Sequence, residues 1–190
     1  IDGYELNIDQ LKGIDPVETI DLSSKGLRSA SCIVIAKCIE FNAVLTSLDL
    51  SRNDLDAEAG KALAKALEVN AVLTSLDLNR NRIGPEGAKA LAEALGSGKA
   101  VLTSLNLRGN SIGPEGAKAL AEAMGSGRAV LTSLNLDMNS IGPEGAKAIA
   151  KALGSGKAVL TDLNLSGNEI SPQGAKAIAE ALRSGKAVLT

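Results

Sequence analysis

The chain repeats itself at a nearly constant interval. Copies of the motif Leu-Thr-x-Leu recur every 28 or 29 residues, and a diverged first copy begins at Val17. Each copy continues as LxxLxL, and an Asn follows three residues after the last Leu in every copy except the first, which has Lys25 there. Self-similarity at this period indicates a solenoid, in which each unit packs mainly against its two neighbours. The copies open at Val17, Leu45, Leu73, Leu102, Leu131 and Leu160.

The first half of each repeat predicts a short strand. Leucines at the fourth and sixth positions, such as Leu48 and Leu50, share one face because strand side chains alternate, so the residue between them faces solvent. The Asn at the ninth position can bond main-chain groups that the turn after the strand leaves unpaired. At Lys25 we therefore expect a looser turn, or one capped by solvent.

The second half of each repeat predicts a helix, as in residues 83–95, which read IGPEGAKALAEAL. Pro85 fits the first helical position, where the missing N–H costs nothing, and Glu86 suits the positive helix end. Asp56 and Ser171 replace Gly at the expected N-cap. The Gly-Ser-Gly-Lys that follows predicts a C-terminal cap with a left-handed glycine. It does not fit a phosphate-binding loop, because the glycine that such a loop requires is missing and the segment runs from helix to strand.

Together these halves predict an α/β fold: a right-handed horseshoe solenoid with a parallel sheet on the concave face and helices on the convex face. Composition agrees, because the chain has one Tyr, one Phe and no Trp, and aliphatic residues must fill thin repeated layers. We predict an N-terminal cap over 1–16, six repeats over 17–188, and the start of a truncated seventh repeat at 189–190. In the cap, Tyr4, Leu6 and Ile8 alternate like an edge strand, and Leu11 and Ile14 are placed to cover the first layer.

The last predicted layer has no such cap. Either the repeats continue beyond it or another molecule covers it, and self-association through this end is a further hypothesis. The near-identity of the later repeats fits recent duplication or consensus engineering, and the unmatched Cys32, Cys38, Met124 and Met138 favour a natural chain.

Several functional classes are disfavoured by composition. The net charge is −2 and the charges alternate in sign, so we expect no nucleic-acid partner. No apolar run is long enough for a membrane span and no signal-peptide pattern opens the chain, so we expect a cytoplasmic protein without a membrane partner. Cys32 and Cys38 lie six residues apart in a predicted helix, separated by about 9 Å of rise, which is too far for a disulfide. With no His and no reactive pocket, we expect no catalytic residue, cofactor or metal site.

The repeats resemble the ribonuclease-inhibitor-like subclass of leucine-rich repeats. LTSLNLRGNSIGPEGAKALAEAM, residues 102–124, is similar to repeats of NOD-like receptors and of related protist and algal proteins. The resemblance spans residues 17–190 and implies the solenoid fold. It implies no single function, because such proteins include pathogen sensors, enzyme inhibitors and GTPase-activating proteins.

Columns of side chains on the predicted concave face are the candidate binding site. Stacked strands place the fifth, seventh and eighth positions of successive repeats side by side. Acidic residues gather toward the N-terminal half, and Arg52 and Arg80 either neutralise them or form a mixed-charge rim. The candidate residues for partner binding are Asp49, Asp77, Arg52, Arg80, Asn106, Arg108, Asp137 and Met138. The alternative is that this strand face is only solvated, with its acidic and basic side chains neutralising one another.

Three classes of function fit this pattern. The leading hypothesis is a non-catalytic protein-interaction scaffold or recognition module within a larger protein, binding an unknown protein through the concave face. The alternatives are a regulator of the GTPase-activating type and a purely structural spacer. A GTPase activator resembling the Ran-directed family would be expected to carry a longer array and an acidic tail.

Overall fold

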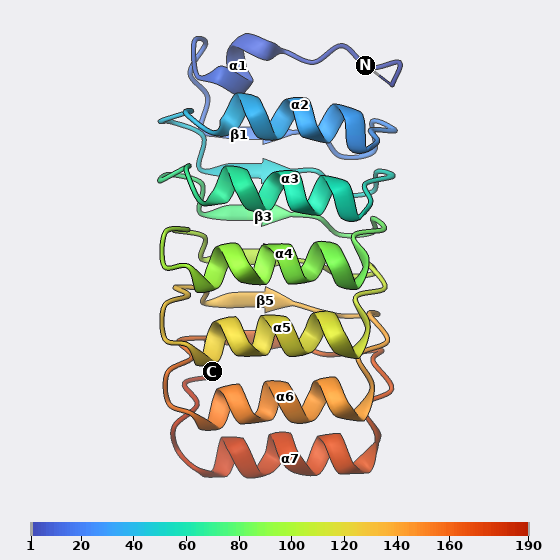
Figure 1. The fold of residues 1–190 in the computed structure, drawn as a ribbon, viewed down its shortest axis with the longest axis vertical. Coiled ribbons are helices and arrows are strands. Elements are labelled where there is room, and N and C mark those ends of the chain that lie inside the picture. Colours follow the sequence, from blue (N-terminus) through green and yellow to red (C-terminus); the bar gives the residue numbers. More distant parts are fainter. Residues whose placement is uncertain (1, 190) are drawn as a thin grey trace.

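The computed structural model describes residues 2–189 as a curved stack of six parallel strands and seven helices (Figure 1). The strands pair in sequence order, each in register with the next. They are β1 Thr19–Asp21, β2 Ser47–Asp49, β3 Ser75–Asp77, β4 Ser104–Asn106, β5 Ser133–Asn135 and β6 Asp162–Asn164. The helices are α1 Ile8–Lys12, α2 Ser29–Ile39, α3 Ala57–Leu67, α4 Gly84–Gly96, α5 Gly113–Gly125, α6 Gly142–Gly154 and α7 Ser171–Arg183. The predicted fold class is confirmed.

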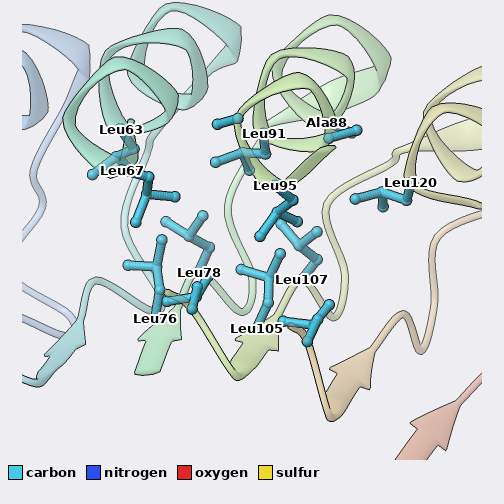
Figure 2. Packing of buried hydrophobic residues seen from close by; sticks show 14 of the residues in the cluster. Leu63, Leu67, Leu76, Leu78, Ala88, Leu91, Leu95, Leu105, Leu107 and Leu120 are labelled. Carbon is cyan, nitrogen blue, oxygen red and sulfur yellow. The ribbon is translucent and has the colours of Figure 1, made fainter. Parts of the chain in front are cut away.

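The core lies between the sheet and the helices. Leu76 of β3 and Leu78, directly after the strand, point toward the helix layer, from which Leu91 and Leu95 of α4 face the sheet. All four side chains are at most 2% exposed (Figure 2). Each repeat adds an equivalent layer of leucine, isoleucine and alanine. The sole phenylalanine, Phe41, is 80% exposed. The core is therefore aliphatic throughout, as the composition predicts.

An asparagine ladder joins the repeats behind the strands. Asn110 is fully buried, and its Nδ2 donates to the carbonyl of Leu78 in the preceding repeat (2.8 Å) and to that of Leu107 in its own (3.1 Å). Its Oδ1 accepts from the Ile83 N–H at 3.1 Å. The predicted role of the Asn column is confirmed, and each amide also ties one repeat to the previous one. The first repeat has Lys25 in place of this Asn. The Lys25 N–H donates to Oδ1 of Asn53 in the second repeat, so the neighbouring repeat closes the turn after β1 that was expected to be looser or capped by solvent.

The helix termini use glycine where the chain requires a left-handed backbone. Gly98 follows α4 with a φ of 78°, as the Gly-Ser-Gly-Lys motif predicts. At the other end, Gly84 has a left-handed φ of 62°, outside the helical region, so Pro85 is the first residue of α4 with a helical backbone, in agreement with the prediction. Asp56 caps α3 as predicted, accepting from the Glu58 and Ala59 N–H groups.

The N-terminal segment differs from its prediction. Residues 4–7 form no strand, and the predicted edge strand is wrong because Ile8 begins the short helix α1, capped by Asn7 and ended by a left-handed Gly13. Leu11 is buried against the first layer, but Ile14 is 69% exposed and covers nothing. Asp2 accepts from the Arg28 N–H and the Ser31 hydroxyl, so the segment also caps α2. The predicted seventh repeat at 189–190 extends beyond the described residues.

Both cysteines lie on α2 as free thiols. Cys32 is buried, and this burial, reinforced by the Asp56 carboxylate, raises its pKa to about 12. Cys38 is partly buried, which raises its pKa to a smaller extent. Neither thiol has the electropositive, exposed setting of a reactive cysteine.

Candidate partner-binding face

The strand register assembles the predicted fifth-position column on the concave face. Asp21, Asp49 and Asp77 pair in sequence, and Asn106, Asn135 and Asn164 continue the same row. Each side chain also accepts a hydrogen bond from the backbone N–H two residues later, as Asp49 Oδ1 does from Ser51 (2.8 Å) and Asn106 Oδ1 from Arg108 (3.1 Å). Asp and Asn are therefore equivalent for the turn, and each carboxylate adds a second oxygen, which in Asp77 accepts from the Asn106 amide.

Asp77 lies where the aspartates of this column give way to asparagines. Its side chain is half-buried, and the Asn106 Nδ2 donates to its Oδ2 at 2.9 Å. Burial raises the pKa of Asp77, the Asn79 N–H and Asn106 amide oppose this effect, and the neighbouring Asp49 adds to it. The charged form is thus disfavoured where the acidic half of the column meets the amide half.

A second group forms around Arg108 in the C-terminal half of the face. Arg108 Nε lies 3.0 Å from Asp137 Oδ2, an ion pair without the alignment of a good hydrogen bond, and an Arg108 terminal nitrogen lies 3.9 Å from the Met138 sulfur. Asp137 is 8% exposed, whereas Met138 is 57% exposed. The Arg108 guanidinium is therefore oriented by Asp137 and lies beside the exposed, apolar side chain of Met138.

Arg52 and Arg80 occupy the eighth-position column. Both are exposed, and within residues 2–189 neither forms an ion pair within 4.0 Å, including with the aspartates of the fifth column. Their φ angles are 54°, in the left-handed region that favours glycine, and Gly109 and Gly167 occupy the equivalent position in other repeats. A large side chain there costs about 1 kcal/mol of backbone strain. In these two repeats the eighth position therefore carries an arginine without an ion-pair partner, although glycine would be unstrained there.

The structure brings the candidate residues together as two groups rather than one. Asp49, Asp77 and Asn106 form a row, and Arg108, Asp137 and Met138 form a cluster one repeat further along. Arg52 and Arg80 lie beside them without contacting the carboxylates.

Sequence reasoning missed a further column on the same face, formed by the third position of each repeat. Ser47, Ser75, Ser104 and Ser133 form a row of partly exposed hydroxyl groups, which ends at Asp162. The Ser133 hydroxyl donates to Asp162 Oδ2 at 3.0 Å. The signal was present as the third residue of the Leu-Thr-Ser-Leu motif.

Two kinds of helix-to-strand loop were also missed. Asn42 and Asn70 are buried in the loops after α2 and α3. Their amide nitrogens donate to carbonyls at or near the end of the preceding helix, and that of Asn70 also to the Asn42 carbonyl. The later loops carry Ser-Gly and a cation instead. Beside Asn42 and Asn70, Phe41 and Val69 are exposed. The signal was the step from 28- to 29-residue spacing.

Other chemistry has little support in the part of the chain that the structure describes. Within residues 2–189 no three His, Cys, Asp or Glu side chains gather closely enough to hold a metal ion. None of the described helices combines the length and apolar character needed to cross a bilayer.

Comparison with known proteins defines the class. The family model described as Leucine Rich repeat matches residues 41–64, 69–92, 99–121, 129–150 and 157–179, more than half of the chain. The protein belongs to the leucine-rich-repeat family. A search of curated protein sequences gave no match.

Among solved structures, the chain is similar to leiomodin-1 actin-binding site 2, with 19% identity and a TM-score of 0.57 over 94% of this chain and 89% of that one. It is also similar to the tropomodulin C-terminal domain of Caenorhabditis elegans, with 12% identity and a TM-score of 0.55 over 93% and 89%. At these identities the likeness concerns the fold.

Proposed function

We propose that this protein is a non-catalytic recognition module that binds a protein partner on its concave face. The observation that carries the proposal is the cluster of Arg108, Asp137 and Met138, in which a directed guanidinium adjoins an exposed thioether. Arginine and methionine are enriched in protein interfaces, and a few such anchors supply most of the binding energy. The leucine-rich-repeat fold supports the proposal by presenting these side chains on an open, curved sheet.

The carboxylate row gives the site its second contact. Asp49 uses only its Oδ1 for the turn, and Asp77 adds a second carboxylate one strand away, which together suit a basic side chain of the partner. A partner that spans both groups therefore needs a cation at one end of its contact region and an acidic or apolar group at the other. Arg52 and Arg80 add two unpaired cations on the rim, which steer an acidic surface during encounter.

The concave-face proposal is tested by changing Asp49→Asn, Asp77→Asn and Arg108→Gln together. The matched control on the convex face is Glu93→Gln, Glu122→Gln and Lys151→Gln, which alters net charge by the same amount. Partners captured by the wild-type protein should be lost by the concave variant and kept by the control. Retention of the partner by the concave variant would show that the face is a solvated surface.

Purified actin is the first partner to test, because the leiomodin-1 structure is described as an actin-binding site. The two alternative functions predict different results in such assays. A GTPase-activating regulator accelerates turnover by a small GTPase, and a spacer captures nothing.

Four further predictions accompany this proposed function. The ribonuclease-inhibitor-like subclass, the likeness to NOD-like receptors and the cytoplasmic location stay predictions. Self-association is supported by the last layer, where Leu163, Leu165 and Ile178 are only partly buried although their equivalents Leu134, Leu136 and Ile149 are at most 1% exposed. Sedimentation over a range of concentrations tests it, with Ile178→Glu as the variant expected to remain monomeric.

A further inference from the structure

The edge formed by the helix-to-strand loops carries a row of cations that the concave-face proposal does not use. These loops run down the left side of Figure 1, where the helices end and the strands begin. After α4, α5, α6 and α7 each loop has one basic residue directly after the left-handed glycine. The four residues, which we call the basic ladder, are Lys99, Arg128, Lys157 and Lys186.

Three of the ladder side chains pack over a glycine of the preceding loop. A Cβ added to Gly98 would lie 3.5 Å from the Arg128 side chain, and one added to Gly127 would lie 3.4 Å from that of Lys157. Gly156 has the same relation to Lys186, so these three aliphatic stems each cross a glycine. This packing holds the stem and leaves the charged head in solvent.

The ladder charges are unpaired. All four residues are exposed, and among residues 2–189 none forms an ion pair within 4.0 Å. Residues 96–103, and the matching loops after α5 and α6, contain no acid. Glu93 and Glu122, on the preceding helices, pair with none of these cations. Four uncompensated charges therefore line one edge of a protein whose net charge is −2.

Apolar side chains accompany the cations. Val130, Val159 and Val188 stand two residues after a ladder residue and are 44%, 45% and 51% exposed. A surface of alternating cationic and apolar groups is complementary to a chain that alternates acidic and apolar residues.

The spacing favours an extended chain. Neighbouring strands lie about 4.8 Å apart and packed helices about 8–10 Å apart, so the loops between them recur at an intermediate distance. Alternate side chains of an extended peptide lie about 6.6 Å apart. An extended peptide with a carboxylate at every second residue therefore presents its charges at a spacing close to that of the ladder cations.

A nucleic acid or a membrane fits the edge less well. The same edge continues toward the N-terminus with exposed Asp15, Glu18 and Glu68, which repel a phosphate backbone or an anionic bilayer that extends beyond the ladder. No aromatic side chain is interleaved with the cations to stack bases. An acidic segment of limited length avoids these charges.

We propose that the basic ladder, with its flanking valines, is a docking edge for an extended acidic segment of a partner protein. The segment pairs its carboxylates with Lys99, Arg128 and Lys157 and places apolar residues against Val130 and Val159. The edge is separate from the concave face, so one partner can occupy both surfaces.

The test measures binding of a 14-residue peptide of alternating Glu and Val by fluorescence anisotropy at low salt. The ladder variant is Lys99→Glu, Arg128→Glu and Lys157→Glu. The control is Lys65→Glu, Lys118→Glu and Lys151→Glu, exposed helix lysines with the same change in charge. The ladder variant should lose roughly tenfold or more in affinity, because three exposed ion pairs are each worth roughly a factor of two to five and the reversed charges also repel the peptide. The control should lose much less.

Each other outcome overturns the proposal. These outcomes are no binding of the peptide to the wild type, an equal loss in both variants, or tighter binding of a 20-nucleotide oligothymidine or of phosphatidylserine vesicles than of the peptide. A peptide in which Lys replaces Glu should not bind. Thermal melts of all variants verify that the exposed substitutions leave the fold intact. Binding of this peptide is independent of Asp49, Asp77 and Arg108, which separates the result from that of the concave-face test.

Discussion

Arg108 Nε lies 3.0 Å from Asp137 Oδ2, so a cation of one repeat pairs with a carboxylate of the next. The Asp137 side chain is 11% exposed and that of Arg108 37%, which limits solvent screening only on the carboxylate side. We expect a double-mutant cycle of Arg108→Met and Asp137→Asn to give a coupling energy of about 1 kcal/mol. Urea unfolding measures it, and a coupling indistinguishable from zero would mean that the pair only sets the direction of the guanidinium.

The asparagine ladder supplies a second prediction. Asn110→Ala leaves the buried Ile83 N–H without its acceptor. The Leu78 and Leu107 carbonyls also lose a donor, but each keeps a bond from the Asn of a neighbouring level, Asn81 and Asn139. One orphaned buried N–H costs about 1–3 kcal/mol, so we expect a loss of about that size in unfolding free energy. Ser104→Ala, on the concave surface of the same repeat, should change it by less than about 0.5 kcal/mol. Similar effects of the two substitutions would contradict a structural role for the amide.

Two glycines of α5 make a matched pair for the packing between helices. A Cβ at Gly116 would lie 2.2 Å from the Ile112 Cγ2 and 3.0 Å from the Ala88 Cβ, whereas one at Gly125 would meet Ala152 at an ordinary 3.7 Å. Gly116→Ala should therefore destabilise the protein by about 1–3 kcal/mol through overpacking. Gly125→Ala should stabilise it by about 0.5–1 kcal/mol, because helical glycine carries an entropic cost. Thermal or urea unfolding decides, and stabilisation by Gly116→Ala would show that the α4 and α5 backbones can move apart.

The sequence predicted the columns because the repeat sets the strand register. Once Leu48 and Leu76 occupy equivalent positions, Asp49 and Asp77 must be neighbours on the opposite face, and the structure places them so. The pattern could not predict which Arg would pair. Arg52 and Arg80 have a left-handed backbone, which a periodic pattern does not encode, and within residues 2–189 neither forms an ion pair within 4.0 Å.

In the N-terminal segment the sequence pattern predicted the wrong element. Tyr4, Leu6 and Ile8 alternate over too few residues to separate a strand from the approach to a helix. The local signals for a helix were Asn7 as a cap and Gly13 as its end. Likewise, the one-residue difference in repeat length held the information on Asn42 and Asn70, because the shorter loops use a buried amide in place of Gly-Ser-Gly.

Two carboxylates should make opposite contributions to the pH dependence of stability. The Ser29 hydroxyl, followed by the Glu58 and Ala59 N–H groups, lowers the pKa of Asp56 below its ordinary value of 3.8. A lowered folded-state pKa stabilises the protein above the unfolded-state pKa, and the contribution is lost as pH falls through the folded-state pKa. Asp56→Asn should therefore lower the unfolding free energy at neutral pH, by less than the roughly 1 kcal/mol expected for Asp56→Ala.

Asp77 reverses the sign. Burial raises its pKa above 3.8, so its ionisation opposes folding once the pH rises past the unfolded-state pKa, and the penalty is complete above the folded-state pKa. Asp77→Asn should raise stability near neutral pH, since an amide oxygen still accepts from the Asn79 N–H as its counterparts do in the later repeats. Urea unfolding of both variants between about pH 7 and about pH 3 measures the two differences from the wild type, which should have opposite signs and shrink together in acid. Differences of the same sign, or ones that persist at the acid end, would mean that the two substitutions act through packing rather than through charge.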